Sequence, residues 1–112
     1  MTNYQQGDII LFPYPFDDFS NAKKRPAIII GNARSKIGAY IVAKVTTGLK
    51  NDKHSFLLDN TRLTHPTPQT CEVRCNEIAT ISETIILKKL STLDKNELMK
   101  LTNLVKNNFD VV

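Results

Sequence analysis

Two short apolar stretches decide the fold of this chain, Asp8-Ile-Ile-Leu-Phe12 and Pro26-Ala-Ile-Ile-Ile-Gly31. The first is a β-prone run entered through Gly7, and it stops at Pro13-Tyr-Pro-Phe16 because proline lacks the backbone N–H that a sheet needs. The second is apolar without alternation, which is typical of a central strand covered on both faces. Both stretches predict strands, and the polar residues from Asp17 to Lys24 predict a long loop between them.

The rest of the chain continues this β pattern and then changes period. Ala39 to Thr46 is rich in β-branched residues and predicts a third strand, and His54 to Leu58 predicts a short one. Thr70 to Arg74 and Glu77 to Ile81 are interpreted as the last strand material. No repeat or low-complexity segment interrupts the pattern.

A helix is predicted at the end of the chain, from Asp94 to Asn107. Asp94 followed by Glu97 resembles a capping box, and one helix face is apolar, formed by Leu98, Leu101, Leu104 and Val105. Short strands without alternating helices, followed by one helix, predict a mainly β fold: a small antiparallel barrel with a C-terminal α-helix. The length of 112 residues predicts a single domain, residues 1–112.

Composition narrows the function only slightly. Fifteen lysines and arginines against 11 acidic residues give a net charge of +4, and the isoelectric point is near 9.2. This balance favours a polyanionic partner such as nucleic acid, although many proteins carry the same charge without one. The sequence shows neither a membrane-spanning stretch nor a signal peptide, so we expect a cytoplasmic protein with no membrane contact.

The histidines and cysteines predict neither a metal site nor a cofactor. His54 and His65 share no ligand spacing with each other or with the cysteines. Cys71 and Cys75 are four residues apart without a second pair, so we expect them to be buried packing residues rather than ligands or nucleophiles.

Arginines and hydroxyls at predicted strand ends are the remaining candidates for chemistry. Arg25 follows two lysines directly before Pro26, and a guanidinium there can hold a phosphate. Thr46 and Thr47 end the third predicted strand, and Arg74 lies in a predicted strand among apolar neighbours. Each has a simpler explanation: a solvated charged turn, ordinary β-propensity, or an outward-facing strand position.

Taken in order, these segments resemble the sequence signature of MazF/PemK-type toxins. The matching segments are Gly7-Asp-Ile-Ile-Leu-Phe12, Pro13-Tyr-Pro-Phe-Asp17, Lys24-Arg25-Pro26, Val45-Thr46-Thr47 and the run from Val73 to Ile81. The resemblance covers roughly the first two-thirds of the chain, and the predicted C-terminal helix agrees with it.

The resemblance implies a fold, an activity and partners. The fold is an SH3-like barrel of the MazF/CcdB/PemK type. The activity is a ribosome-independent and metal-independent endoribonuclease that cuts single-stranded RNA at short sequences, by attack of the ribose 2′-hydroxyl to give a 2′,3′-cyclic phosphate. The partners are a second copy in a homodimer and a cognate antitoxin whose disordered segment covers the RNA groove.

Carried over residue by residue, the resemblance implies that Arg25, Thr46 and Arg74 are catalytic. We also expect RNA to be bound by Lys23, Lys24, Arg34, Lys36, Thr47 and Asn76. Two departures stand out. PemK-like members have a candidate general-base aspartate where this chain has Asn76, and they have a histidine in the first loop, whereas this chain has none before Arg34. Two alternatives therefore stay open: a non-catalytic protein binder of the gyrase-poison kind, and an RNA binder that does not cleave.

Overall fold

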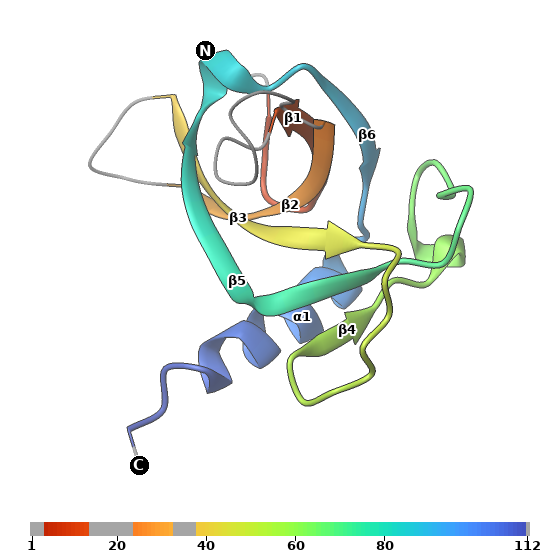
Figure 1. The fold of residues 1–112 in the computed structure, drawn as a ribbon, viewed down its shortest axis with the longest axis vertical. Helices are drawn as coiled ribbons and strands as arrows, with labels where there is room; N and C mark the ends of the chain where they lie inside the picture. The colour runs from red at the N-terminus through yellow and green to blue at the C-terminus, as the bar shows by residue number, and fades with distance from the viewer. Residues whose placement is uncertain (1–3, 14–23, 33–37, 112) are drawn as a thin grey trace.

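The computed structural model describes residues 4–13, 24–32 and 38–111. Within these residues, six strands form one antiparallel sheet in the order β4-β5-β3-β2-β1-β6, which curls into a partial barrel (Figure 1). The strands are β1 (Asp8–Pro13), β2 (Lys24–Asn32), β3 (Ala39–Thr46), β4 (Ser55–Leu57), β5 (Glu72–Ser82) and β6 (Lys88–Thr92). Two 3-10 turns, Asn60–Arg62 and Glu83–Ile85, and the helix α1 (Lys95–Asn107) complete the fold.

The predicted mainly β fold with a C-terminal helix is confirmed, and the predicted strands are found with small shifts of their ends. Two details of the sequence-based prediction are corrected. Glu77 to Ile81 does not end the sheet, because Lys88–Thr92 adds β6 beside β1. The segments predicted around Arg74 and Ile78 are parts of one strand, β5.

A bulge in β5 bends the sheet at the place where several polar side chains gather. Adjacent residues of β3, Ala43 and Lys44, pair with Ile78 and Arg74 of β5, so the residues from Cys75 to Glu77 are inserted between the two pairs. Such an insertion interrupts the alternation of side chains and sharpens the local twist. Figure 1 shows β5 changing direction along its length.

The two faces of the sheet carry separate apolar clusters. One cluster packs under α1 and contains Ile9, Ile28, Ala43, Val45, Val73, Leu101 and Val105. The other is formed by the alternate residues on the opposite face, Ile10, Phe12, Ala27, Ile29, Tyr40, Val42 and Ile81. Because β2 contributes to both clusters, its apolar run has the two-sided burial that the sequence predicted.

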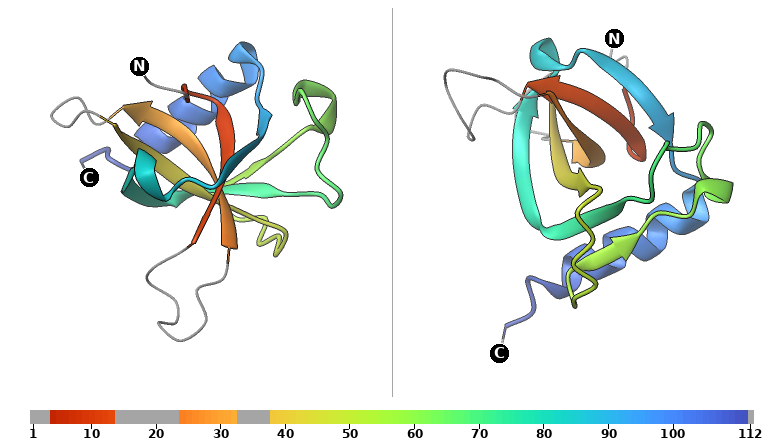
Figure 2. Two further views of the ribbon diagram at one scale, coloured as in Figure 1. Left: turned by 90° about the horizontal axis from the view of Figure 1, so that it is seen from above. Right: turned by 45° about the vertical axis from the view of Figure 1, so that its right-hand side comes forward.

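The C-terminal helix is anchored at its start and along its length. The Asp94 carboxylate accepts a hydrogen bond from the backbone N–H of Glu97 at 2.9 Å, which confirms the predicted N-cap. Backbone bonds from Thr64 N–H to Thr92 O, 3.0 Å, and from Asp94 N–H to Arg62 O, 2.9 Å, tie the segment after β4 to the end of β6. Along its length α1 contacts β5, and Figure 2 shows it lying outside the curled sheet. In the described part of the chain, this helix is too short and too polar to cross a membrane.

Candidate functional site

A row of polar side chains crosses three neighbouring strands on the face opposite α1. Ala27 of β2 pairs with Lys44 of β3, and Lys44 pairs with Arg74 of β5. Paired residues share a face of the sheet, so Lys44 and Arg74 continue the face that carries Ala27. Two residues further along β3, Thr46 pairs with Glu72. The β2–β3 pairs end at Ala27 and Lys44, and Arg25 and Thr46 each lie two residues beyond that pair, on the same face of their strands.

Arg25 lies where β2 begins, at the boundary between core and solvent. It pairs with the buried Phe12 of β1 and is itself half-buried, whereas Lys24 before it is exposed. The sequence-based prediction missed two further cations because it missed their strand. Lys88 and Lys89 of β6 are exposed and pair with residues of β1. In the sequence, only the Lys88-Lys89 dipeptide itself could have indicated these two cations. Together with Lys24 on β2, the two lysines place positive charge on both sides of β1.

Thr46 ends β3 with its hydroxyl held by the following turn. The backbone N–H of Gly48 donates to Thr46 Oγ1 at 3.0 Å. A hydroxyl has two acceptor lone pairs and one proton, so this bond fixes the oxygen while the proton can still be donated. Because Arg25 lies on the same face of the neighbouring strand, Thr46 can present a hydrogen-bond donor to an anion that the guanidinium binds.

Arg74 is buried in a cluster of carboxylates. Its side chain is 4% exposed. It donates to both carboxylate oxygens of Asp52, at 2.9 and 3.0 Å, and to Glu72 Oε2 at 2.8 Å. Ser55 Oγ lies 2.9 Å from the same guanidinium, and Glu77 Oε2 lies 3.4 Å from Nε. All three side-chain nitrogens of Arg74 therefore donate to oxygens of the protein itself.

The charges of this cluster favour a structural role. Hydrogen bonds from Arg74 lower the pKa of Asp52. Burial alone would raise the pKa of Glu72, but hydrogen bonds from Ser55, Arg74 and two backbone N–H groups outweigh it and lower this pKa too. Lys44 Nζ lies 3.7 Å from Glu77. Three carboxylates against two cations leave the cluster with one excess negative charge, which does not attract a phosphate.

The other residues expected to bind RNA fall in different places. Asn76 is exposed and lies in the β5 bulge, so it does not share a regular strand face with the buried Arg74. Thr47 lines an apolar cavity of about 350 Å³ together with Ile9, Pro26, Val45, Cys71 and Leu90. Pro26 and Val45 alternate with Arg25 and Thr46 along their strands, and Ile9, Val45 and Cys71 belong to the apolar cluster under α1, so the cavity opens on the other face of the sheet. Lys23, Arg34 and Lys36 lie outside the described residues.

The cysteines and histidines have structural surroundings. Cys71 and Cys75 are buried and unpaired thiols, and burial raises the pKa of Cys75 to about 11, which makes it a poor nucleophile. His54 Nδ1 lies 2.9 Å from Asn108 Oδ1, beyond the C-terminal end of α1, and His65 is exposed. Across residues 4–13, 24–32 and 38–111, no group of three or more His, Cys, Asp or Glu side chains is arranged to hold a metal ion.

Solved structures with the same fold include MazF toxins. The chain is similar to the Mycobacterium tuberculosis toxin MazF-mt6 at 20% identity and a TM-score of 0.72, covering 94% of this chain and 98% of that one. It is also similar to MazE–MazF (Form-III) from Deinococcus radiodurans, at 12% identity and a TM-score of 0.76, over 96% and 97% of the two chains. An endoribonuclease in complex with its cognate antitoxin from a mycobacterial species matches at 12% identity and a TM-score of 0.74, over 95% and 94%.

Sequence similarity identifies the family. No curated protein sequence is similar enough to this chain to count as a match. Residues 5–109, however, match the sequence model of the family described as PemK-like, MazF-like toxin of type II toxin–antitoxin system. Because this match spans nearly the whole chain and the fold agrees with it, the protein belongs to the PemK-like, MazF-like family of type II toxins.

Proposed function

We propose that this toxin is a metal-independent endoribonuclease that cuts single-stranded RNA, with Arg25 and Thr46 as its catalytic residues. The observation that carries the proposal is their placement: a half-buried arginine and a fixed hydroxyl lie on neighbouring strands and on one face, each two residues beyond the last β2–β3 pair. The family gives the proposal its reaction class. Lys24, Lys88 and Lys89 add exposed positive charge near the start of β2, where an RNA backbone can bind.

The reaction is a transfer of the phosphate within the RNA strand. The ribose 2′-oxygen forms a bond to the adjacent phosphorus and loses its proton, while the bond to the 5′-oxygen breaks and that oxygen gains a proton. The products are a 2′,3′-cyclic phosphate and a 5′-hydroxyl. Arg25 neutralises the charge that develops on the phosphorane, and Thr46 donates to one of its oxygens.

No side chain is assigned as the general base. The carboxylates of Asp52 and Glu72 are tied to Arg74, which lowers their pKa values and makes them weak bases at neutral pH. Position 76 holds an amide, which cannot accept the proton. We therefore expect slow turnover that depends on electrostatic stabilisation by Arg25 and Thr46.

The proposed partners are single-stranded RNA, a cognate antitoxin and a second copy of the chain. Two solved relatives are complexes of MazF with MazE or of an endoribonuclease with its antitoxin. A homodimer would double the basic surface near β1, β2 and β6. Sedimentation at micromolar concentration tests this part, since a species of only 12.6 kDa would exclude the dimer.

Incubation of the purified protein with a long single-stranded RNA, in the presence of EDTA, tests the activity. We expect cleavage that yields 5′-hydroxyl ends, which accept a labelled phosphate from a polynucleotide kinase without prior phosphatase treatment. The Arg25→Ala variant is the matched control, and it should leave the RNA intact. Retardation of the RNA without cutting would instead support an RNA binder that does not cleave, and neither effect would favour a protein-binding toxin.

A further inference from the structure

The turn after Thr46 is exposed, yet its backbone is fixed by one buried side chain. Residues 47 to 53 are all exposed. Asn51 has a φ of +49°, in the left-handed region that residues other than glycine adopt rarely. Glu72 Oε1 accepts hydrogen bonds from the backbone N–H groups of Lys50, at 3.0 Å, and of Asn51, at 3.3 Å. The Glu72 carboxylate therefore holds the turn at Asn51, the residue with the left-handed backbone conformation.

Glu72 divides its two oxygens between the turn and the sheet. Its side chain is 1% exposed. While Oε1 binds the turn, Oε2 accepts from Ser55 Oγ at 2.7 Å and from Arg74 Nη1 at 2.8 Å. Glu72 also pairs across the sheet with Thr46, at the end of β3 from which the turn departs. One buried residue thus links the position of Thr46, the turn and β4.

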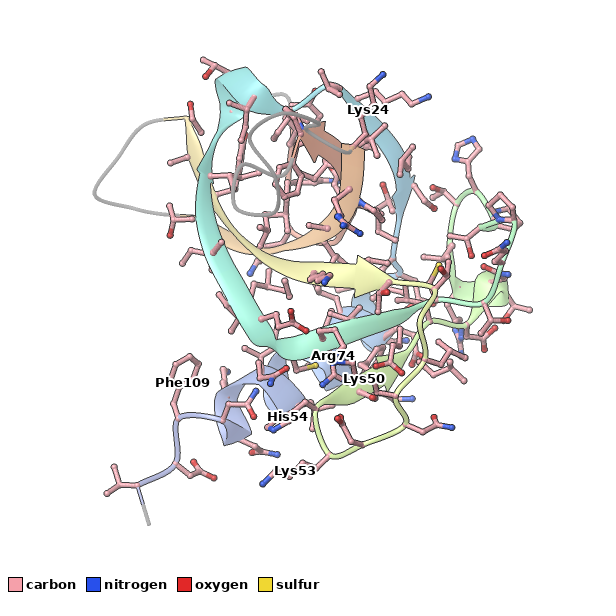
Figure 3. All side chains as sticks on the ribbon, in the orientation of Figure 1. Lys24, Lys50, Lys53, His54, Arg74 and Phe109 are labelled. Carbon is pink, nitrogen blue, oxygen red and sulfur yellow. The ribbon has the colours of Figure 1, made fainter. Side chains whose placement is uncertain are left out.

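Arg74 makes this arrangement possible by compensating the buried negative charge. A carboxylate that is removed from water is unfavourable unless a cation and hydrogen-bond donors replace the water. Arg74 supplies the charge to Glu72, and it also binds both oxygens of Asp52 at the far end of the turn. Figure 3 shows Arg74 close to the Lys50 and Lys53 part of the turn and distant from Lys24.

We propose that Glu72 is a positioning residue for Thr46, and that Arg74 holds Glu72 and Asp52 instead of contacting the RNA. The chain of contacts runs from Arg74 to Glu72, from Glu72 to the backbone of Lys50 and Asn51, and through the turn to Gly48, whose N–H fixes the Thr46 hydroxyl. The inference rests on the proposed role of Thr46 in RNA cleavage. It predicts that a change at Glu72 lowers the cleavage rate because the Thr46 hydroxyl is no longer held in place.

A double-mutant cycle in single-turnover cleavage tests this path. Glu72→Gln replaces one carboxylate oxygen by an NH2 group, which donates hydrogen bonds instead of accepting them, so the turn and Arg74 can no longer both be satisfied. We expect the cleavage rate to fall roughly tenfold or more, with RNA affinity nearly unchanged. In a Thr46→Val background the same change should have little further effect on the rate, because residues that act as a unit are not additive.

Glu77→Gln is the matched control, because Glu77 also lies beside Arg74 but is 38% exposed, and it should cleave at the wild-type rate. A Glu72→Gln effect of equal size in the wild-type and Thr46→Val backgrounds would overturn the inference, as would a Glu77→Gln effect of the same size. Amide hydrogen exchange, measured without RNA, separates this inference from the proposed function. Faster exchange at Lys50 and Asn51 in Glu72→Gln supports the positioning role even if the wild type cuts no RNA, and unchanged exchange contradicts it.

Discussion

Arg25 and Arg74 differ in their surroundings although the family resemblance assigns both to catalysis. Arg25 is the second residue of β2 and is half-buried, with exposed Lys24 before it and Thr46 on the same face of the neighbouring strand β3. Arg74 lies inside the sheet, and its guanidinium binds the carboxylates of Asp52, Glu72 and Glu77. The same side chain can therefore stabilise a transition state at one position and a buried carboxylate at the other.

The difference between the two sites comes from their neighbours. A guanidinium that already binds two oxygens of one carboxylate and one of another has lost most of its capacity to bind phosphate. The β5 bulge contributes to this, because it brings Glu77 to Arg74 and leaves Asn76 exposed.

Arg25→Ala should lower the cleavage rate about 100-fold or more, because it removes a preorganised charge from the developing phosphorane. The unfolding midpoint should stay close to that of the wild type, since Arg25 is half-buried at a strand end. Arg25→Lys should restore only part of the rate, because an ammonium lacks the planar fork of donors. Single-turnover kinetics and thermal unfolding measure both effects, and wild-type cleavage by Arg25→Ala would place the active site elsewhere.

Thr46→Val should lower the cleavage rate roughly 10- to 100-fold. A hydrogen bond to a charged group contributes about 1.5–3 kcal/mol, and this variant loses one such bond to the phosphorane. Thr46→Ser keeps the hydroxyl that accepts from Gly48 and should remain much closer to the wild type. Equal rates for the valine and serine variants would show that the hydroxyl does not contact the phosphate.

Asn76→Asp tests whether the missing aspartate alone limits the reaction. We expect no gain in rate and a modest loss of RNA affinity, because position 76 lies in the bulge near a cluster that already has one excess negative charge. RNA retardation and single-turnover cleavage measure the two quantities. A clear increase in rate would restore a general base at this position.

The carboxylate cluster predicts a loss of stability in acid. The folded-state pKa of Asp52 lies below its ordinary value of 3.8, so at low pH the unfolded chain binds more protons than the folded one. The stabilisation is complete above the unfolded-state pKa and is lost as the pH falls below it. Asp52→Asn should therefore show a smaller fall in unfolding midpoint between pH 5 and 3 than the wild type. An identical fall of the unfolding midpoint in both proteins would show that Asp52 does not contribute to the acid dependence of stability.

Local patterns were sufficient to predict most of the fold. Ala39 to Thr46 was predicted with its observed ends because β-branched residues fill the strand. The run from Lys88 to Thr92 was missed because only Ser91 in it is buried, so no apolar alternation marks it as a strand. Its place in the sheet depends on pairing with β1, and no local pattern encodes that pairing.

The candidate site was less predictable because its contacts are distant in sequence. Arg25 and Thr46 could be singled out as polar residues at the ends of predicted strands. The contact between Glu72 and Arg74 could also be expected, because the two residues are two apart on one strand. Asp52, however, is separated from Arg74 by 22 residues and lies in a turn. Only the paired register of β3, β4 and β5 brings them together, and that contact is what turns Arg74 into a buried structural residue.

Parallel measurement of unfolding and cleavage for Arg25→Ala and Arg74→Met tests whether one arginine serves cleavage and the other serves stability. Loss of Arg74 leaves Glu72 buried without its cation, so we expect the free energy of unfolding to fall by about 3 kcal/mol. Arg25→Ala should keep the stability and lose the cleavage. If Arg74→Met were as stable as the wild type but inactive, or if Arg25→Ala unfolded while Arg74→Met did not, the separation of roles between the two arginines would be wrong.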